Sequence, residues 1–135
     1  MNIIICGAGR VGISISAQLS KQGHSITVID KNSEDIQIVN DTQDAKGIVG
    51  IATHPSVLEK ADAKNADMII AVTRNDETNM VVCQIAHSLF NVSRKIARIR
   101  SKEFLKPVWK NLFSKENLPI DIIISPEFEV AQSLY

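Results

Sequence analysis

Six short runs rich in isoleucine, valine and other apolar residues alternate along the chain with longer amphipathic stretches. Such alternation is typical of βαβ units, in which helices connect parallel strands. Most of the runs are almost continuously apolar, as strands must be when helices cover both faces of their sheet. The predicted strands span residues 2–6, 25–29, 47–51, 68–72, 95–99 and 121–124.

The first two connections carry clear helix signals. A first helix is expected over about residues 10–21, with Val11, Ile15 and Leu19 on one face and Gly23 as its stop. A second helix is expected to open at Asn32 or Ser33, residue types that favour the N-cap position.

The later helices differ in regularity. A third is expected to begin at His54 and Pro55, because proline is tolerated at a first helical position. A fourth is expected over residues 76–90, followed by Asn91 as its C-cap. Its predicted inward face comprises Val81, Val82, Ile85, Ala86 and Leu89. A fifth, near residues 102–113, is the least regular because it contains Pro107, and its Trp109 and Phe113 are expected to serve packing.

A glycine-rich turn follows the first predicted strand, with Gly7, Gly9 and Gly12 spaced G-x-G-x-x-G. The first glycine allows a tight turn, the second lets the backbone approach a pyrophosphate, and the third lets the helix pack close to the strand. The start of the helix then holds the phosphate charge. Arg10, between two of the glycines, is expected either to reach an extra phosphate, in its own or a neighbouring subunit, or to remain solvated.

An acidic residue, Asp30, lies 18 positions after Gly12 at the end of the second strand. In this context an acidic side chain accepts hydrogen bonds from an adenosine ribose, so the sequence predicts an adenine nucleotide. The alternative is a glycine turn with a helix-capping aspartate. An acid here disfavours a 2′-phosphate, whereas the neighbouring Lys31 leaves NADP open.

The predicted fold is α/β: a Rossmann-like doubly wound parallel six-stranded sheet in the order 3-2-1-4-5-6, with helices on both faces. Ligands bind such sheets beyond the carboxyl ends of the first and fourth strands. The further residues expected beside this crevice are Ala52, Thr53, Thr73, Arg74, Asn79 and Arg98.

Two assignments near the crevice stay open at this level. Asp76, Glu77 and Asn79 lie in the first turn of the fourth helix, where they either stabilise the helix N-terminus or contact a ligand. Arg98 and Arg100 lie two residues apart near the end of the fifth predicted strand. We expect one of them to face the ligand, and we favour Arg98.

Composition excludes several classes of protein. The chain of 135 residues is long enough for one domain, and its formal net charge is zero, so its overall field gives no reason to expect nucleic acid or anionic lipid. Cys6 and Cys83 lack a C-x-x-C spacing and are expected as buried, reduced thiols. The three histidines form no metal spacing, so we expect neither a metal site nor catalytic residues.

The two ends of the chain bear on the expected localisation and domain bounds. The first residues lack a signal peptide or membrane span, which predicts a cytoplasmic protein. Residues 126–135 begin a helical pattern with an apolar stripe, expected to be the start of a linking helix that is truncated here and continues in a longer chain or packs on a partner. Residues 1–125 then form the nucleotide-binding domain.

The runs "GAGRVG", "VIDK", "GIATHPSVLEKADAKNADMIIAVTRNDETNM" and "ARIR" together resemble the RCK/KTN (TrkA-N) domain family of regulatory subunits of Trk potassium-uptake systems. The resemblance runs from residue 1 to about residue 126. It implies a Rossmann sheet that binds NAD or NADH, or else ATP or ADP, without hydride transfer. It also implies homodimers or larger rings on the cytosolic face of a membrane ion channel.

The resemblance also implies roles for individual residues. It places Asp30 on the adenosine ribose, Thr73 and Arg74 near the crevice, and Arg98 at the far phosphate or nicotinamide side. The residues it places on the phosphates are Gly7, Ala8, Gly9, Arg10 and Val11. In one departure, this sequence has Ile51 where family members often carry an acidic residue.

The function expected from these features is a nucleotide-binding regulatory domain that gates a potassium-uptake channel of the Trk type, peripheral to the inner face of the plasma membrane through the channel subunit. No nucleic acid and no direct membrane insertion are expected. The alternative is the NAD-binding portion of an NAD-dependent oxidoreductase, which needs a second domain to hold its substrate.

Overall fold

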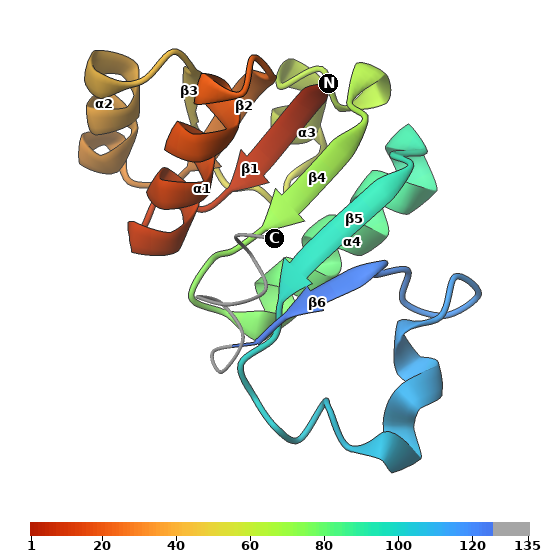
Figure 1. Ribbon diagram of the computed structural model, residues 1–135. Coiled ribbons are helices and arrows are strands. Elements are labelled where there is room, and N and C mark those ends of the chain that lie inside the picture. Colours follow the sequence, from red (N-terminus) through yellow and green to blue (C-terminus); the bar gives the residue numbers. More distant parts are fainter. Residues whose placement is uncertain (126–135) are drawn as a thin grey trace.

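A parallel six-stranded sheet in the order β3-β2-β1-β4-β5-β6 forms the centre of the protein (Figure 1). The structure, a computed structural model, describes residues 1–125. The predicted doubly wound α/β fold is therefore confirmed, while the predicted helix after residue 125 lies outside the described residues. The strands are β1 (Asn2–Cys6), β2 (Ser25–Asp30), β3 (Lys46–Val49), β4 (Met68–Ala71), β5 (Arg94–Arg98) and β6 (Ile122–Ile124).

Helices connect successive strands and occupy the two faces of the sheet (Figure 1). They are α1 (Arg10–Lys21), α2 (Ser33–Thr42), α3 (Pro55–Lys60) and α4 (Asp76–Phe90), with 3₁₀ segments η1 (Ala63–Asn65) and η2 (Pro107–Phe113). The bounds of α1 and α4 are those that the sequence predicts. Gly23 (φ +89°) and Asn91 (φ +52°) both adopt positive φ just after these helices, which confirms the two predicted stops.

Two apolar layers hold the sheet between the helices. Ile3 and Ile5 of β1 pack in the layer that includes Val11 of α1 and Ile36 of α2. The intervening Ile4 of β1 packs in the layer that includes α3 and α4. Neighbouring residues of one strand therefore enter opposite layers, which explains why the strand sequences are apolar throughout.

The predicted inward face of α4 is partly wrong. Val81 and Leu89 are 44% and 61% exposed. The side chains of α4 that are buried belong to Asn79, Met80, Val82, Cys83 and Ala86. The prediction assigns the inward face from apolar residues alone. The buried face of α4 begins instead with a polar residue, Asn79, which is hydrogen-bonded to the residues at the ends of β4 and β5.

The predicted fifth helix is also wrong. The chain forms turns up to Lys106 and then the 3₁₀ segment η2, with a non-helical kink at Trp109. A helix cannot run from residue 102 because proline at 107 disfavours helical conformation in the residue before it and supplies no N–H. Phe113 packs against the core as expected, whereas Trp109 is 52% exposed.

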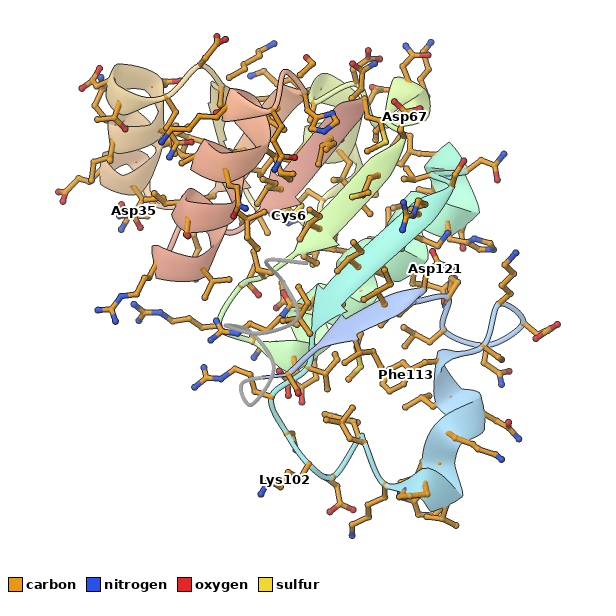
Figure 2. The ribbon with its side chains drawn as sticks, viewed as in Figure 1. Cys6, Asp35, Asp67, Lys102, Phe113 and Asp121 are labelled. Atoms are coloured by element: carbon orange, nitrogen blue, oxygen red, sulfur yellow. The ribbon has the colours of Figure 1, made fainter. Side chains whose placement is uncertain are left out.

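A buried lysine, Lys95, connects β5 to Asp121 at the start of β6, and Figure 2 labels this aspartate. The Lys95 side chain is 5% exposed, and its Nζ donates a 2.8 Å hydrogen bond to the carbonyl of Val92 and lies 3.7 Å from the Asp121 carboxylate. The same carboxylate accepts a 2.7 Å hydrogen bond from the backbone N–H of Lys95. These contacts hold Asp121, the residue before β6, against β5 and so position the C-terminal end of the connection that contains η2.

Candidate functional site

The turn after β1 depends on two glycines for steric reasons. Gly7 has φ +117°, and a Cβ there would lie 2.8 Å from the carbonyl oxygen of Val72. A Cβ on Gly12 would overlap the carbonyl oxygen of Gly7. Only glycine at both positions lets α1 start directly against the ends of β1 and β4.

Gly9, unlike the other two glycines of the motif, has free space beside its backbone. A Cβ added to Gly9 would meet nothing within 4 Å, and the residue has the ordinary extended conformation (φ −77°, ψ −167°). Neither backbone strain nor protein packing therefore requires glycine at position 9. The open space beside its backbone is where the pyrophosphate of a nucleotide would lie.

The N-terminus of α1 lacks the groups that stabilise the other two long helices in the described part of the chain. No side chain caps it, and its first turn contains no acidic residue. In contrast, Asn32 caps α2 and Asn75 caps α4, each accepting a hydrogen bond from a first-turn N–H, and acidic residues follow both. The N–H groups and the positive dipole end of α1 are thus left for an external anion, and Arg10 adds an exposed positive charge.

Asp30 joins the end of β2 to this turn. Its Oδ2 accepts a 2.7 Å hydrogen bond from the Ala8 N–H, and its Oδ1 accepts a 2.8 Å bond from the Asn32 N–H. A carboxylate has about four acceptor sites, so two remain for the hydroxyls of a ribose. The Ala8 N–H is engaged by Asp30 and is therefore not among the donors free for a phosphate, and the Ala8 side chain is buried.

The ends of β4 and β5 are held together by Asn79, whose side chain is completely buried. Its Oδ1 accepts hydrogen bonds from the Thr73 N–H (2.9 Å) and the Thr73 hydroxyl (2.6 Å). Its Nδ2 donates to the carbonyls of Thr73 (3.2 Å) and Arg98 (2.8 Å). Both polar groups of the amide are bonded within the protein and none of its surface is exposed, so the structure favours the structural alternative for Asn79 over contact with a ligand.

Asp76 has a role that the sequence does not reveal. Its carboxylate accepts 2.9 Å and 2.8 Å hydrogen bonds from the N–H groups of Arg100 and Ser101, just beyond β5. It therefore ties the start of α4 to the chain after β5, and the helix cap is Asn75 instead. β5 ends at Arg98, so Arg100 lies outside the strand.

The remaining predicted residues lie at the same edge of the sheet. Arg74 follows Thr73 at the end of β4 and is exposed, and Lys31 is exposed beside Asp30. After β3, Ala52 is almost fully buried and Thr53 is half-buried, so the side of the crevice expected to take the adenine is lined by small residues. Val11 packs into the layer under α1, and the Arg98 side chain is half-buried.

Two hollows lie at the opposite edge, where the strands begin. One of about 120 Å³ is lined by residues that include Asn2, Ser25 and Asp62, and one of about 550 Å³ by residues that include His24 and Lys46. Neither hollow is lined by the glycine turn after β1 or by the N-terminus of α1. The geometry for an anion therefore lies at the carboxyl edge.

Both cysteines are interior groups, and Cys6 lies at the end of β1 (Figure 2). Burial raises the pKa of the Cys6 thiol far above its usual range and raises the pKa of Cys83 to about 12. Both are therefore protonated and unreactive near neutral pH, as the sequence predicts. Within residues 1–125, no group of three or more metal-ligating side chains is gathered at one place, and no helix is long and apolar enough to span a bilayer.

Comparison with known proteins places this geometry in a family. A model of the TrkA-N domain matches residues 3–126. The Trk system potassium uptake protein TrkA of Azorhizobium caulinodans is 47% identical over 132 residues. That alignment covers 98% of this chain and 29% of the relative, so this chain spans less than a third of that protein's length.

Solved structures share the fold at low sequence identity. The TrkA-N domain of the inner membrane protein ybaL from Escherichia coli superposes with a TM-score of 0.80 at 16% identity, covering 98% of this chain and 93% of that one. The AMP-bound form of the Kef CTD of Shewanella denitrificans gives 0.76 at 22% identity, covering 99% and 77%. The GsuK channel bound to NAD gives 0.74 at 19% identity, covering 91% and 21%.

Proposed function

The chain belongs to the TrkA-N domain family, and we propose that it is a regulatory domain that binds NAD or NADH at the carboxyl edge of its sheet and controls a potassium-uptake channel of the Trk type. The observation that carries the proposal is the uncapped N-terminus of α1 beside a glycine turn, with the Asp30 carboxylate fixed 2.7 Å from the Ala8 N–H. This arrangement presents donors and a dipole for a pyrophosphate next to acceptors for a ribose.

The residues fit the parts of a dinucleotide in order along the edge. Gly9 and the first N–H groups of α1 hold the pyrophosphate, and Asp30 accepts the hydroxyls of the adenosine ribose. The space after β3, beside Ala52 and Thr53, takes the adenine, and Thr73 and Arg74 face the other half of the ligand. Arg98 contributes a positive charge toward the far phosphate or the nicotinamide.

Charge at the ribose end favours NAD and NADH over their phosphorylated counterparts. A 2′-phosphate would place its charge against the Asp30 carboxylate, which already accepts two backbone hydrogen bonds and is held in place by them. ATP and ADP remain acceptable because they offer the same ribose hydroxyls. Arg10, exposed at the N-terminus of α1, supplies a partner for an additional phosphate.

Regulation requires that the ligands differ in affinity for two arrangements of the domain, because a ligand that binds both equally shifts nothing. The Asn79 and Asp76 bonds connect the crevice wall to the carbonyl of Arg98 and to the N–H groups of residues 100 and 101. A displacement of Thr73 on ligand binding would therefore act, through the Asn79 hydrogen bonds, on the end of β5 and the residues that follow it.

The partner in this proposal is the membrane-embedded channel subunit of a Trk system. In this proposal the domain acts at the cytoplasmic face as a homodimer or a larger ring. The name of the Azorhizobium relative and the channel context of the GsuK structures support this assignment. The nucleotide serves as a signal rather than as a hydride donor.

Calorimetric titration of the chain with NAD, NADH, ATP and ADP tests the proposal. We expect micromolar binding with a preference within the NAD/NADH or ATP/ADP pair, and no change in absorbance at the nicotinamide band when small alcohols or hydroxy acids are added with NAD. Failure to bind any of the four would contradict the proposal, and turnover would favour the oxidoreductase alternative.

A further inference from the structure

The connection between β5 and β6 extends from the sheet beyond its edge strand (Figure 1). Phe104, Leu105 and Phe113 pack against the core and anchor this connection at both ends. Between these anchors, every residue from 106 to 111 is exposed. We call these six residues, Lys106, Pro107, Val108, Trp109, Lys110 and Asn111, the η2 tip.

The η2 tip combines apolar side chains with lysines. Val108 is 71% exposed and Trp109 is 52% exposed, and Lys106 and Lys110 flank them. The wider connection over residues 102–117 carries four lysines against two glutamates in a chain whose net charge is zero. Lys106 pairs with Glu103 (Nζ–Oε2 3.1 Å), and the connection still carries a net excess of two positive charges. This excess is local and surrounds Val108, the most exposed large apolar side chain of the described residues.

Packing inside the domain does not explain this composition. Figure 2 shows Lys102 at the outer side of the connection and Phe113 on the side toward β6. Trp109 interrupts the 3₁₀ geometry (φ −103°, ψ 15°) instead of continuing it. An indole is costly to leave in water, and it suits a boundary where its ring is apolar and its N–H meets polar groups.

Two kinds of surface accept an exposed tryptophan: a protein partner and a lipid interface. Tryptophan is enriched both at protein interfaces and at the headgroup level of a bilayer, so the lysines discriminate between the two surfaces. Lysine is depleted at protein interfaces and common beside tryptophan in segments that lie on a bilayer. Lysines near an anionic leaflet each add to the attraction. The composition of the η2 tip therefore favours anionic lipid.

We propose that the η2 tip docks on the surface of an anionic phospholipid bilayer, with Val108 and Trp109 entering the headgroup region while Lys106 and Lys110 contact the phosphates. This goes beyond the proposed nucleotide-dependent function and does not depend on it. One tip binds weakly, because only two apolar side chains enter, and several copies in one assembly bind more tightly.

The chain contains a single tryptophan, so the fluorescence of Trp109 reports on the η2 tip alone. Vesicles of phosphatidylcholine with phosphatidylglycerol, added in low salt, should shift its emission to shorter wavelength and raise its intensity. Vesicles of phosphatidylcholine alone should leave the emission unchanged. High salt should reverse the shift because the attraction is screened.

Matched variants distinguish binding through the η2 tip from a general effect of the protein's net charge. Lys106→Glu with Lys110→Glu should weaken binding to anionic vesicles by at least about tenfold. Lys60→Glu with Lys64→Glu changes two exposed lysines of α3 and η1, alters the net charge equally and should leave binding unchanged. Trp109→Ser, read by sedimentation with vesicles, should also reduce binding without any change of charge.

Several outcomes would overturn the proposal. These are no shift with anionic vesicles, an equal shift with neutral vesicles, an equal shift with soluble glycerol phosphate, or equal losses in the two double-lysine variants. A shift that instead grows with protein concentration in the absence of lipid would assign the tip to contact between copies of this chain. A negative result in the vesicle experiments would overturn lipid binding only. Nucleotide binding is tested separately by calorimetric titration.

Discussion

The side-chain amide of Asn79 donates a 2.8 Å hydrogen bond to the carbonyl of Arg98, and so connects the first turn of α4 to the end of β5. The oxygen of the same amide accepts two hydrogen bonds from Thr73 after β4. One buried side chain therefore fixes two neighbouring strand ends at the edge where a nucleotide would bind. The shape of that edge depends on a residue that the ligand does not reach.

Replacing Asn79 with alanine should lower the free energy of unfolding by about 2–4 kcal/mol, because buried donors and acceptors of Thr73 and Arg98 would lose their partner. Urea denaturation of the two proteins measures the difference. Asn117→Ala is a suitable control, since Asn117 is exposed and its side chain donates a single hydrogen bond to the Asn111 carbonyl. Similar small losses in both variants would show that the Asn79 network contributes little to stability.

The glycine turn offers a pair of substitutions with opposite expected effects. Gly12→Ala should cost about 1–3 kcal/mol of stability, because its Cβ overlaps the Gly7 carbonyl oxygen and α1 must shift. Gly9→Val should cost only about 1 kcal/mol, the typical difference between cap residues, and should abolish nucleotide binding. Thermal unfolding and calorimetric titration measure the two effects. A Gly9→Val protein that still binds NADH would remove the pyrophosphate from this turn.

Asp30→Asn tests the ribose contact at nearly constant side-chain size, and its NH2 group also replaces one of the two oxygens that accept hydrogen bonds from the Ala8 and Asn32 N–H groups. We expect binding of NADH to weaken by about 1–3 kcal/mol, because an amide offers one acceptor oxygen where the carboxylate offers two. The preference for NADH over NADPH should narrow at the same time, since the negative charge that opposes a 2′-phosphate is lost. Asp35→Asn, in the first turn of α2, is the control with the same loss of charge. Unchanged affinities in Asp30→Asn would contradict the assignment.

The buried thiols predict an alkaline loss of stability. Burial raises the pKa of Cys83 from 9.0 to about 12 and raises that of Cys6 as well, so the unfolded chain releases these protons at lower pH than the folded chain does. The free energy of unfolding should therefore be unaffected by these groups below about pH 9 and should fall as the pH rises above it. Urea denaturation across this range measures the slope, and the Cys6→Ala, Cys83→Ala double variant should show a smaller slope. An equal slope would assign the effect to other groups.

The sequence predicts the strand order, α1 and α4 well because local signals and burial agree there. Continuous apolar runs mark the strands, and Gly23 and Asn91 end the two helices with positive φ. The glycine spacing likewise predicts the turn, since sterics at Gly7 and Gly12 allow no other residue. At the helix ends, residues close in sequence determine the conformation, and at Gly7 the close approach of Val72 adds a steric restriction.

The roles of Asn79, Asp76 and Trp109 are not apparent in the sequence because their partners are distant or absent. Asn79 reaches Arg98, 19 residues further along the chain, and Asp76 reaches residues 100 and 101. A polar residue in a first helical turn looks like a cap whether or not such a contact exists. The exposure of Trp109 follows from the break at Pro107, which turns an expected amphipathic helix into a projecting connection.

Backbone amide NMR of the labelled chain titrated with NADH tests whether the nucleotide binds at the carboxyl edge of the sheet. We predict that the largest chemical-shift changes occur at Gly9, Arg10, Val11 and the residues around Asp30 and Thr73. Changes concentrated instead at the opposite edge, around Ser25 and Lys46, would place the ligand in a hollow where the strands begin and would contradict the account.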